Sequence, residues 1–162
     1  MITQEQANSI FQYKDGKLFW KTKHSCNFKE KNQPEAGYVC DRGYCTIRIK
    51  TKLYLAHRLI FLMHHGYMPE FIDHIDGNKS NNKIENLRSA DRCQNGWNRK
   101  PYSNNKSGTK NVKWNRNSKS WVVNLDVKKQ RIYCGSFKDL EFADLVAQEA
   151  RDLYHQQFAR HF

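Results

Sequence analysis

The sequence lacks the long apolar run that a membrane span or a secretory signal needs. Its longest aliphatic and aromatic run covers residues 59–63, far short of the ~18 residues that a transmembrane helix requires. Residues 1–6 have neither a cationic start nor a following apolar stretch, so no signal peptide is indicated. We therefore expect a cytoplasmic protein with no membrane partner.

Cysteine is scarce and shows no pattern. The five cysteines are an odd number, and none forms a Cys-x-x-Cys pair, which argues against a disulfide framework and against a zinc ribbon. Cys40 and Cys45 could meet across a hairpin, but reduced thiols packed as small apolar groups are the expectation. A length of 162 residues allows one domain or two small ones and excludes a large enzyme with an elaborate cofactor cleft. We expect no small-molecule cofactor.

Acidic residues are few beside the basic ones. The chain has 16 Asp and Glu against 28 Lys and Arg, a net charge of +12, which points to a polyanionic partner. The imbalance is greatest over residues 96–133, where ten Lys and Arg accompany one acid, Asp126. Residues 139–156 instead carry mainly acids, so this segment is not expected to touch a nucleic acid.

The patterning predicts an α+β chain in two parts. Short aromatic and β-branched runs dominate residues 1–56, which predicts a β-rich N-terminal region, and apolar residues recur at helical spacing over 57–65. Residues 96–110 are cationic and turn-forming, as is typical of a linker. Beyond them we expect strands at about 111–116, 120–127 and 130–135, and an amphipathic helix near 139–156.

Alternation along the three C-terminal strands gives their sheet two different faces. One face, packed on the helix, holds the apolar residues. Amide and cationic side chains on the open face suit base edges and phosphates, although a solvated face on a basic protein is the simpler alternative. The apolar face is predicted to hold Val112, Trp114, Trp121, Val123, Leu125, Ile132 and Cys134, and the open face Lys113, Asn115, Asn124, Arg131 and Tyr133.

Residues 71–95 hold the residues with chemistry. Asp73-His74, Gly77-Asn78, Asn81-Asn82 and the run 85–88, Glu-Asn-Leu-Arg, occur in order, and this pattern resembles the HNH (ββα-metal) nucleases, in particular the phage-type homing endonucleases. The segment 56–60, Ala-His-Arg-Leu-Ile, resembles the one that precedes the motif in that family. The resemblance spans about residues 52–98 and implies a ββα-metal core.

The resemblance also assigns roles to four residues. It makes Asp73 and Asn95 metal ligands, His74 the general base, and Asn86 the residue that orients His74. If the Asn86 oxygen accepts the Nδ1 proton, Nε2 is left as the base. The alternative is that Asp73 and Asn95 cap turns and His74 is a surface histidine.

The resemblance implies one divalent ion and a phosphodiester hydrolase. Many HNH enzymes have histidine where this chain has Asn95, and the oxygen ligand favours Mg²⁺ or Mn²⁺ over Zn²⁺. Products with 5′-phosphate and 3′-hydroxyl ends are expected. Homing, and a bacterial host cytoplasm if a phage encodes the chain, are also implied by the family.

A second resemblance covers about residues 107–155. The segments 107–114, 120–125 and 131–137 resemble the ethylene-response-factor (Apetala-type) DNA-binding domain, in which a three-stranded sheet backed by one helix enters the major groove. Several arginines of that family are here Lys, Asn or Tyr, so its target sequence does not transfer. The expected DNA-binding residues are Arg58, Arg88, Arg99 and Lys100 for phosphates, and Lys110, Lys113, Asn115, Asn124, Arg131 and Tyr133 on the sheet.

The sequence thus predicts a monomeric, site-guided endonuclease for double-stranded DNA. Residues 1–98 form the nuclease part with its core at 52–98, residues 99–108 a basic linker, and residues 109–162 the DNA-binding domain. One alternative is a DNA-binding regulator with an inactive HNH core, and another is a structure-specific or RNA-directed nuclease. A single site nicks one strand most simply, and sequential cuts or transient pairing would give double-strand breaks.

Overall fold

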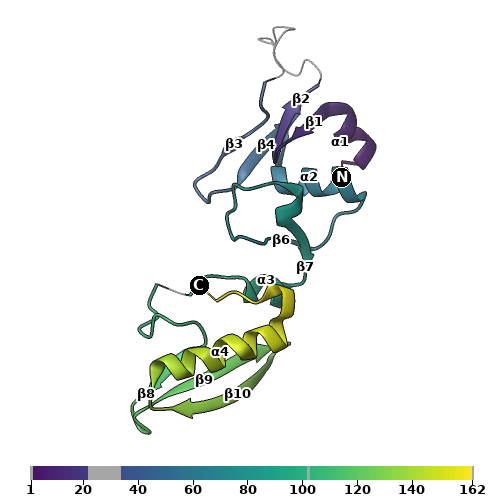
Figure 1. Cartoon of the computed structure of the whole chain (residues 1–162). Coiled ribbons are helices and arrows are strands. Elements are labelled where there is room, and N and C mark those ends of the chain that lie inside the picture. The colour runs from purple at the N-terminus through teal and green to yellow at the C-terminus, as the bar shows by residue number, and fades with distance from the viewer. Residues whose placement is uncertain (1, 22–33, 102, 162) are drawn as a thin grey trace. The chain divides into compact units, whose positions relative to one another are not determined.

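The computed structural model describes residues 2–21, 34–101 and 103–161. Two compact units make up the chain, Met1–Ser89 and Ala90–Phe162, and each is described by itself (Figure 1). Helices and small antiparallel sheets occur in both units, which confirms the predicted α+β class. Within the described ranges, no helix is both long and apolar enough to cross a membrane.

The first unit joins short strands to two helices. Thr3 and Gln6 form a capping box at the start of α1, which satisfies free N–H groups of its first turn. The left-handed backbone of Gly66, with φ of 75°, ends α2, as favoured at a helix C-terminus. Its elements are α1 (Gln4–Ile10), β1 (Phe11–Lys14), β2 (Lys17–Trp20), β3 (Tyr38–Val39), β4 (Cys45–Ile49), β5 (Lys52–Leu55), α2 (Ala56–His65), β6 (Phe71–His74), the 3₁₀ helix η1 (Ile84–Asn86) and β7 (Leu87–Ala90).

One apolar core holds the first unit together. The strands β1 and β2 form a hairpin, β3, β4 and β5 form an antiparallel sheet in that order, and β6 pairs with β7. Leu59 and Ile60 of α2 are fully buried together with Phe11 and Ile47 from the strands. Burying each such side chain contributes roughly 1.5–3 kcal/mol. The same core includes Ile72 of β6 and Leu87 of β7, so it fixes the two strands on either side of the polar loop at 75–86.

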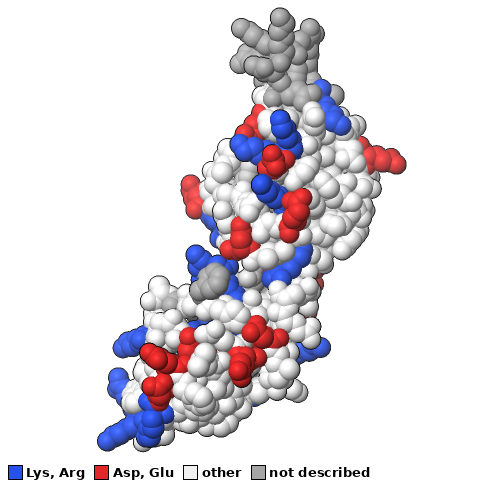
Figure 2. All heavy atoms as spheres, in the orientation of Figure 1, with Lys and Arg blue, Asp and Glu red and all other residues white. Residues whose placement is uncertain are grey.

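The second unit is a three-stranded sheet with a helix on one face (Figure 1). Val112, Val123 and Leu125 of the sheet are buried against Ala143 and Ala147 of the helix, as the predicted alternation requires. Acidic side chains lie over α4 on the face shown in Figure 2, in agreement with the predicted acidic helix. The elements are α3 (Arg92–Trp97), β8 (Val112–Asn115), β9 (Ser120–Val127), β10 (Gln130–Phe137), α4 (Leu140–His155) and η2 (Gln156–Phe158), with strand order β10-β9-β8.

The segment predicted as a linker belongs to the second unit and is bonded within it. The Trp97 ring stacks on His155 with centroids 4.3 Å apart and planes 7° apart, and its Nε1 donates to the Asp126 carbonyl at 2.9 Å. The Lys110 ammonium donates to the carbonyls of Arg99 (2.8 Å) and Trp97. A lysine that leaves water must find such acceptors. The two compact units divide at residues 89 and 90, and the predicted bounds 1–98, 99–108 and 109–162 stay predictions.

The described cysteines Cys40, Cys45, Cys93 and Cys134 are all free. Cys26 lies outside the described residues. Burial raises the pKa of the Cys45 thiol, so it favours the neutral form. These four cysteines therefore match the expected reduced, partly buried groups.

Candidate active site

Asp73 and His74 lie at the end of β6, and both are buried. Successive side chains of a strand point to opposite sides, so a carboxylate and an imidazole next to each other need a strand end to cooperate. The strand ends at His74, where the Gly77 N–H donates to the His74 carbonyl at 2.8 Å and Gly77 has a φ of 70°. A turn therefore follows directly after His74 at the end of β6.

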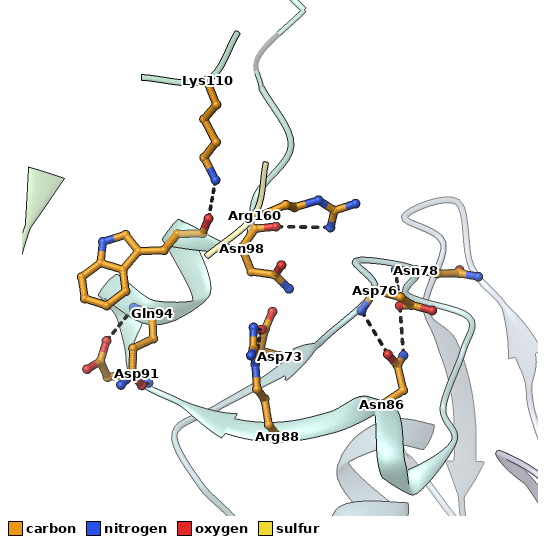
Figure 3. Close-up of polar contacts among 11 residues, drawn as sticks. Asp73, Asp76, Asn78, Asn86, Arg88, Asp91, Gln94, Asn98, Lys110 and Arg160 are labelled. Carbon is orange, nitrogen blue, oxygen red and sulfur yellow. Dashed lines mark hydrogen bonds and ion pairs between the residues drawn. The ribbon is translucent and has the colours of Figure 1, made fainter. Parts of the chain in front are cut away.

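Asp76 and Asn86 hold together the loop that follows β6 (Figure 3). The Asp76 carboxylate accepts from the Asn78 backbone (2.7 Å) and from the side chains of Asn81 (2.7 Å) and Asn86 (2.9 Å). The Asn86 oxygen in turn accepts from the Asp76 backbone N–H at 3.0 Å. Partial burial raises the pKa of Asp76, but these hydrogen bonds outweigh it and the net pKa is lowered. The ionised Asp76 carboxylate therefore holds the loop together through the hydrogen bonds that it accepts.

Asn82, a motif residue to which the sequence assigned no role, forms a hydrogen bond to the His74 ring. Its Oδ1 lies 3.0 Å from His74 Nε2, and Asn82 is only 3% exposed. An amide oxygen accepts and does not donate, so this contact needs a proton on Nε2, and in a neutral ring Nδ1 would then hold the lone pair. The sequence predicted the reverse, with Asn86 bonded to Nδ1. Among the described residues, the Asn86 amide bonds to Asp76 and Asn81 instead, because the loop turns it toward its own backbone.

Two further rings surround His74. His57 of α2 is 5% exposed and meets the His74 ring edge to face, with centroids 5.0 Å apart. The Tyr44 ring lies 5.4 Å from His57 and 6.2 Å from His74, and the Lys79 ammonium lies over it at 4.8 Å. Burial, followed by the nearby charges of His74 and Arg58, lowers the pKa of His57 to about 3. His57 is thus a neutral residue that packs against His74 and Tyr44.

Arg88 forms an ion pair with Asp73 (Figure 3). Its Nε donates to Asp73 Oδ2 at 2.8 Å, and a terminal nitrogen lies 2.7 Å from the same oxygen. Arg58 donates to the carbonyls of Pro69 (3.1 Å) and Glu70 (3.2 Å), just before β6. Both arginines, which the sequence predicts to hold DNA phosphates, therefore also bind the protein around β6.

Asn95 lies half-buried on α3, in the second unit. A capping box starts this helix, in which the Asp91 carboxylate accepts from the Gln94 backbone and the Gln94 side chain accepts from the Asp91 backbone, both at 2.8 Å. A carboxylate and an amide oxygen are donors that suit Mg²⁺ or Mn²⁺. No group of three or more His, Cys, Asp or Glu that could hold a metal occurs in the part of the chain that the structure describes. The pairing of Asp73 with Asn95 around one ion stays a prediction.

A basic cavity of about 1000 Å³ lies within the second unit. Of the predicted sheet residues, Lys110, Lys113, Asn124 and Arg131 line it, as do Arg99 and Lys100. Arg131 also pairs with Asp126 at 2.9 Å, at an exposed site. The cavity thus brings together six of the predicted DNA-binding side chains around the sheet.

The predicted sheet residues also differ in their individual surroundings. Tyr133 is exposed, whereas the Asn115 oxygen accepts from the backbone of Asn117 at 2.9 Å and so serves the turn. Burial, with Arg151 and Arg160 nearby, lowers the pKa of Lys110 to about 8. Trp114, predicted on the helix face, is 47% exposed. It lies on an edge strand, where its ring meets Trp121 edge to face with centroids 4.9 Å apart.

Comparison with known proteins agrees with the HNH motif. A family described as HNH endonuclease matches residues 54–96. Protein 3.8 of Escherichia phage T7 is 36% identical over 90 residues, which cover 56% of this chain and 74% of that protein. No solved structure matches, and the family match ends before residues 107–155, whose resemblance stays a prediction. The chain therefore carries an HNH endonuclease domain at residues 54–96 and belongs to the same family as the phage T7 protein.

Proposed function

We propose that this protein is a metal-dependent endonuclease that hydrolyses phosphodiester bonds of double-stranded DNA to 5′-phosphate and 3′-hydroxyl ends. The supporting observation is the buried Asp73-His74 pair at a strand end, with the His74 ring fixed by Asn82, inside the HNH match. An Asp-His pair next to a phosphate is suited to hydrolysis by an activated water.

In this proposal His74 takes a proton from the attacking water at Nδ1. The hydrogen bond from Nε2–H to Asn82 keeps the ring in one tautomer and orientation, and the His57 ring packs against it. Asp76 and Asn86 hold the loop that carries Asn82. A neutral imidazole can accept a proton from water through its free ring nitrogen. Asn82 and Asn86 are thus positioning residues, and His74 carries the proton.

Asp73 and Asn95 would hold the divalent ion. When bound, it would supply charge stabilisation for the phosphate and for the leaving 3′ oxygen. Their carboxylate and amide oxygens fit Mg²⁺ or Mn²⁺ by donor chemistry.

The second unit is proposed to bind DNA through its basic cavity and the open face of its sheet. The contact residues would be Arg99, Lys100, Lys113 and Asn124, which line the cavity, and the exposed Tyr133, which pairs with Asn124 across the sheet. Binding by a tethered second module raises the local concentration of DNA at the nuclease site. We propose that one monomer acts at a time.

The biological setting proposed is a bacterial host cell infected by a phage, because the relative named above is a phage protein. Homing, in which cleavage promotes the spread of the protein's own gene, is proposed from the family resemblance. A target site close to the insertion point of the gene would be the expected substrate.

The test is conversion of supercoiled plasmid carrying candidate target DNA, with Mg²⁺, Mn²⁺ or EDTA. We expect metal-dependent nicked or linear DNA from the wild type and none from His74→Ala. His65→Ala, an exposed histidine of α2, is the matched control and should cut normally. Salt-sensitive DNA binding with no cleavage under any condition would refute the proposal. The product form shows whether one strand or two are cut.

A further inference from the structure

Asp73, a proposed metal ligand, forms an ion pair with Arg88. The two side chains are 6% and 14% exposed, so both charges are largely removed from water. Two guanidinium nitrogens approach the same carboxylate oxygen, Oδ2, at 2.8 and 2.7 Å. A buried carboxylate left without a counter-charge is strongly unfavourable. Arg88 therefore supplies a positive charge that balances the buried Asp73 carboxylate.

The same contact opposes a cation on Asp73. A divalent ion bound to this carboxylate would come within a few ångströms of a guanidinium that is always charged. Like charges at that distance repel, and little water screens them at a buried site. The cation must therefore either share Asp73 with Arg88 at reduced affinity or displace it.

We propose that Arg88 is a positioning residue that occupies Asp73 as a substitute cation and so keeps the metal affinity of the free enzyme low; this rests on the proposed function. A DNA phosphate near the site offers the guanidinium another anionic partner, and Arg–phosphate pairs are strong and directional. Transfer of Arg88 from Asp73 to the phosphate then leaves the carboxylate to the metal. DNA and metal binding are thereby coupled, each favouring the other.

The test is Mn²⁺ binding without DNA, measured from the electron paramagnetic resonance signal of the free ion. Arg88→Gln removes the positive charge, and we expect binding about 10-fold tighter than in the wild type, an order-of-magnitude value for like charges a few ångströms apart. Arg88→Lys keeps the charge and should stay within about 2-fold of the wild type, since the Coulomb repulsion remains. Equal or weaker Mn²⁺ binding by Arg88→Gln would overturn the proposal.

A measurement on the wild type covers the case in which Arg88→Gln does not fold. The Nε–H proton of Arg88, held by Asp73, gives a nuclear magnetic resonance signal that should shift or vanish as Mg²⁺ is added. The same Mg²⁺ concentrations should raise the melting temperature of the wild type but not of Asp73→Asn. An unchanged Arg88 signal together with an Asp73-dependent rise in melting temperature would contradict the proposal.

Failure of the inference is distinguishable from failure of the proposed function. If Asp73→Asn binds Mn²⁺ as well as the wild type, Asp73 is not a ligand, and the metal site itself is refuted. If Asp73→Asn loses binding but Arg88→Gln gains none, the metal site stands and only the role of Arg88 fails.

Discussion

Acid should weaken the first unit through His57. In the unfolded chain its imidazole has an ordinary pKa of about 6.5, whereas burial lowers it to about 3 in the folded protein. His57 therefore binds a proton below about pH 6.5 in the unfolded state, but only below about pH 3 in the folded state. Stability is fully present above pH 6.5 and falls as the pH drops between these two values.

The size of the effect follows from linkage. Between pH 8 and pH 5, a shift from 6.5 to about 3 removes about 2 kcal/mol of unfolding free energy, which is roughly a 30-fold change in the equilibrium. The side chain is only 5% exposed, so solvent screens little of this effect. Since domains of this size are stable by only about 5–15 kcal/mol, a loss of 2 kcal/mol is readily measured.

Hydrogen exchange followed by mass spectrometry is the appropriate assay, because peptides from β4 and α2 report on the first unit separately. After correction for the intrinsic exchange rate, wild-type protection of these peptides should fall about 30-fold more than that of His57→Gln between pH 8 and pH 5. His65→Gln, an exposed histidine of the same helix, should keep the wild-type pH dependence. An equal loss in His57→Gln and the wild type would refute the reasoning.

Two further substitutions test the active-site geometry and the second core. Asn82→Ala should lower kcat by roughly 10–100-fold with little change in KM, as loss of an orienting partner does. Plasmid nicking at several DNA concentrations measures both constants. A change confined to KM would contradict the positioning role. Leu125→Ala, at a fully buried position of β9, should cost about 2–5 kcal/mol in urea unfolding, against less than about 0.5 kcal/mol for the exposed Lys128→Ala.

The sequence predicted the parts of the site that depend on local chemistry. Asp76-Gly77-Asn78 marks a turn, because glycine accepts a positive φ and the flanking side chains bond to nearby backbone. That turn places the strand end at His74. In the second unit, alternation assigned Val112, Val123 and Leu125 correctly to the helix face. These features needed only residue order.

The partner of His74 could not be predicted in the same way. Asn82 and Asn86 both follow His74 in one polar loop, and either amide is long enough to reach the ring. The outcome depends on the path of the loop, which Asp76 sets by accepting bonds from Asn81 and Asn86. Once Asn86 is bonded to Asp76, Asn82 is the amide that meets Nε2. Sequence spacing alone does not determine which of the two amides bonds to the His74 ring.

Several basic side chains form bonds within the protein, and this too depends on tertiary contacts. The net charge therefore overstates the number of cations available to DNA. Lys110 donates to backbone carbonyls of the second unit, Arg58 to those before β6, and Arg88 to Asp73. A count of Lys and Arg treats all three as surface cations. Their burial depends on tertiary contacts, which composition does not reveal. Each cation held by the protein is one fewer available to neutralise a phosphate, unless DNA releases it as proposed for Arg88. The number of phosphate contacts, and with it the salt dependence of DNA binding, should therefore be smaller than the basic composition indicates.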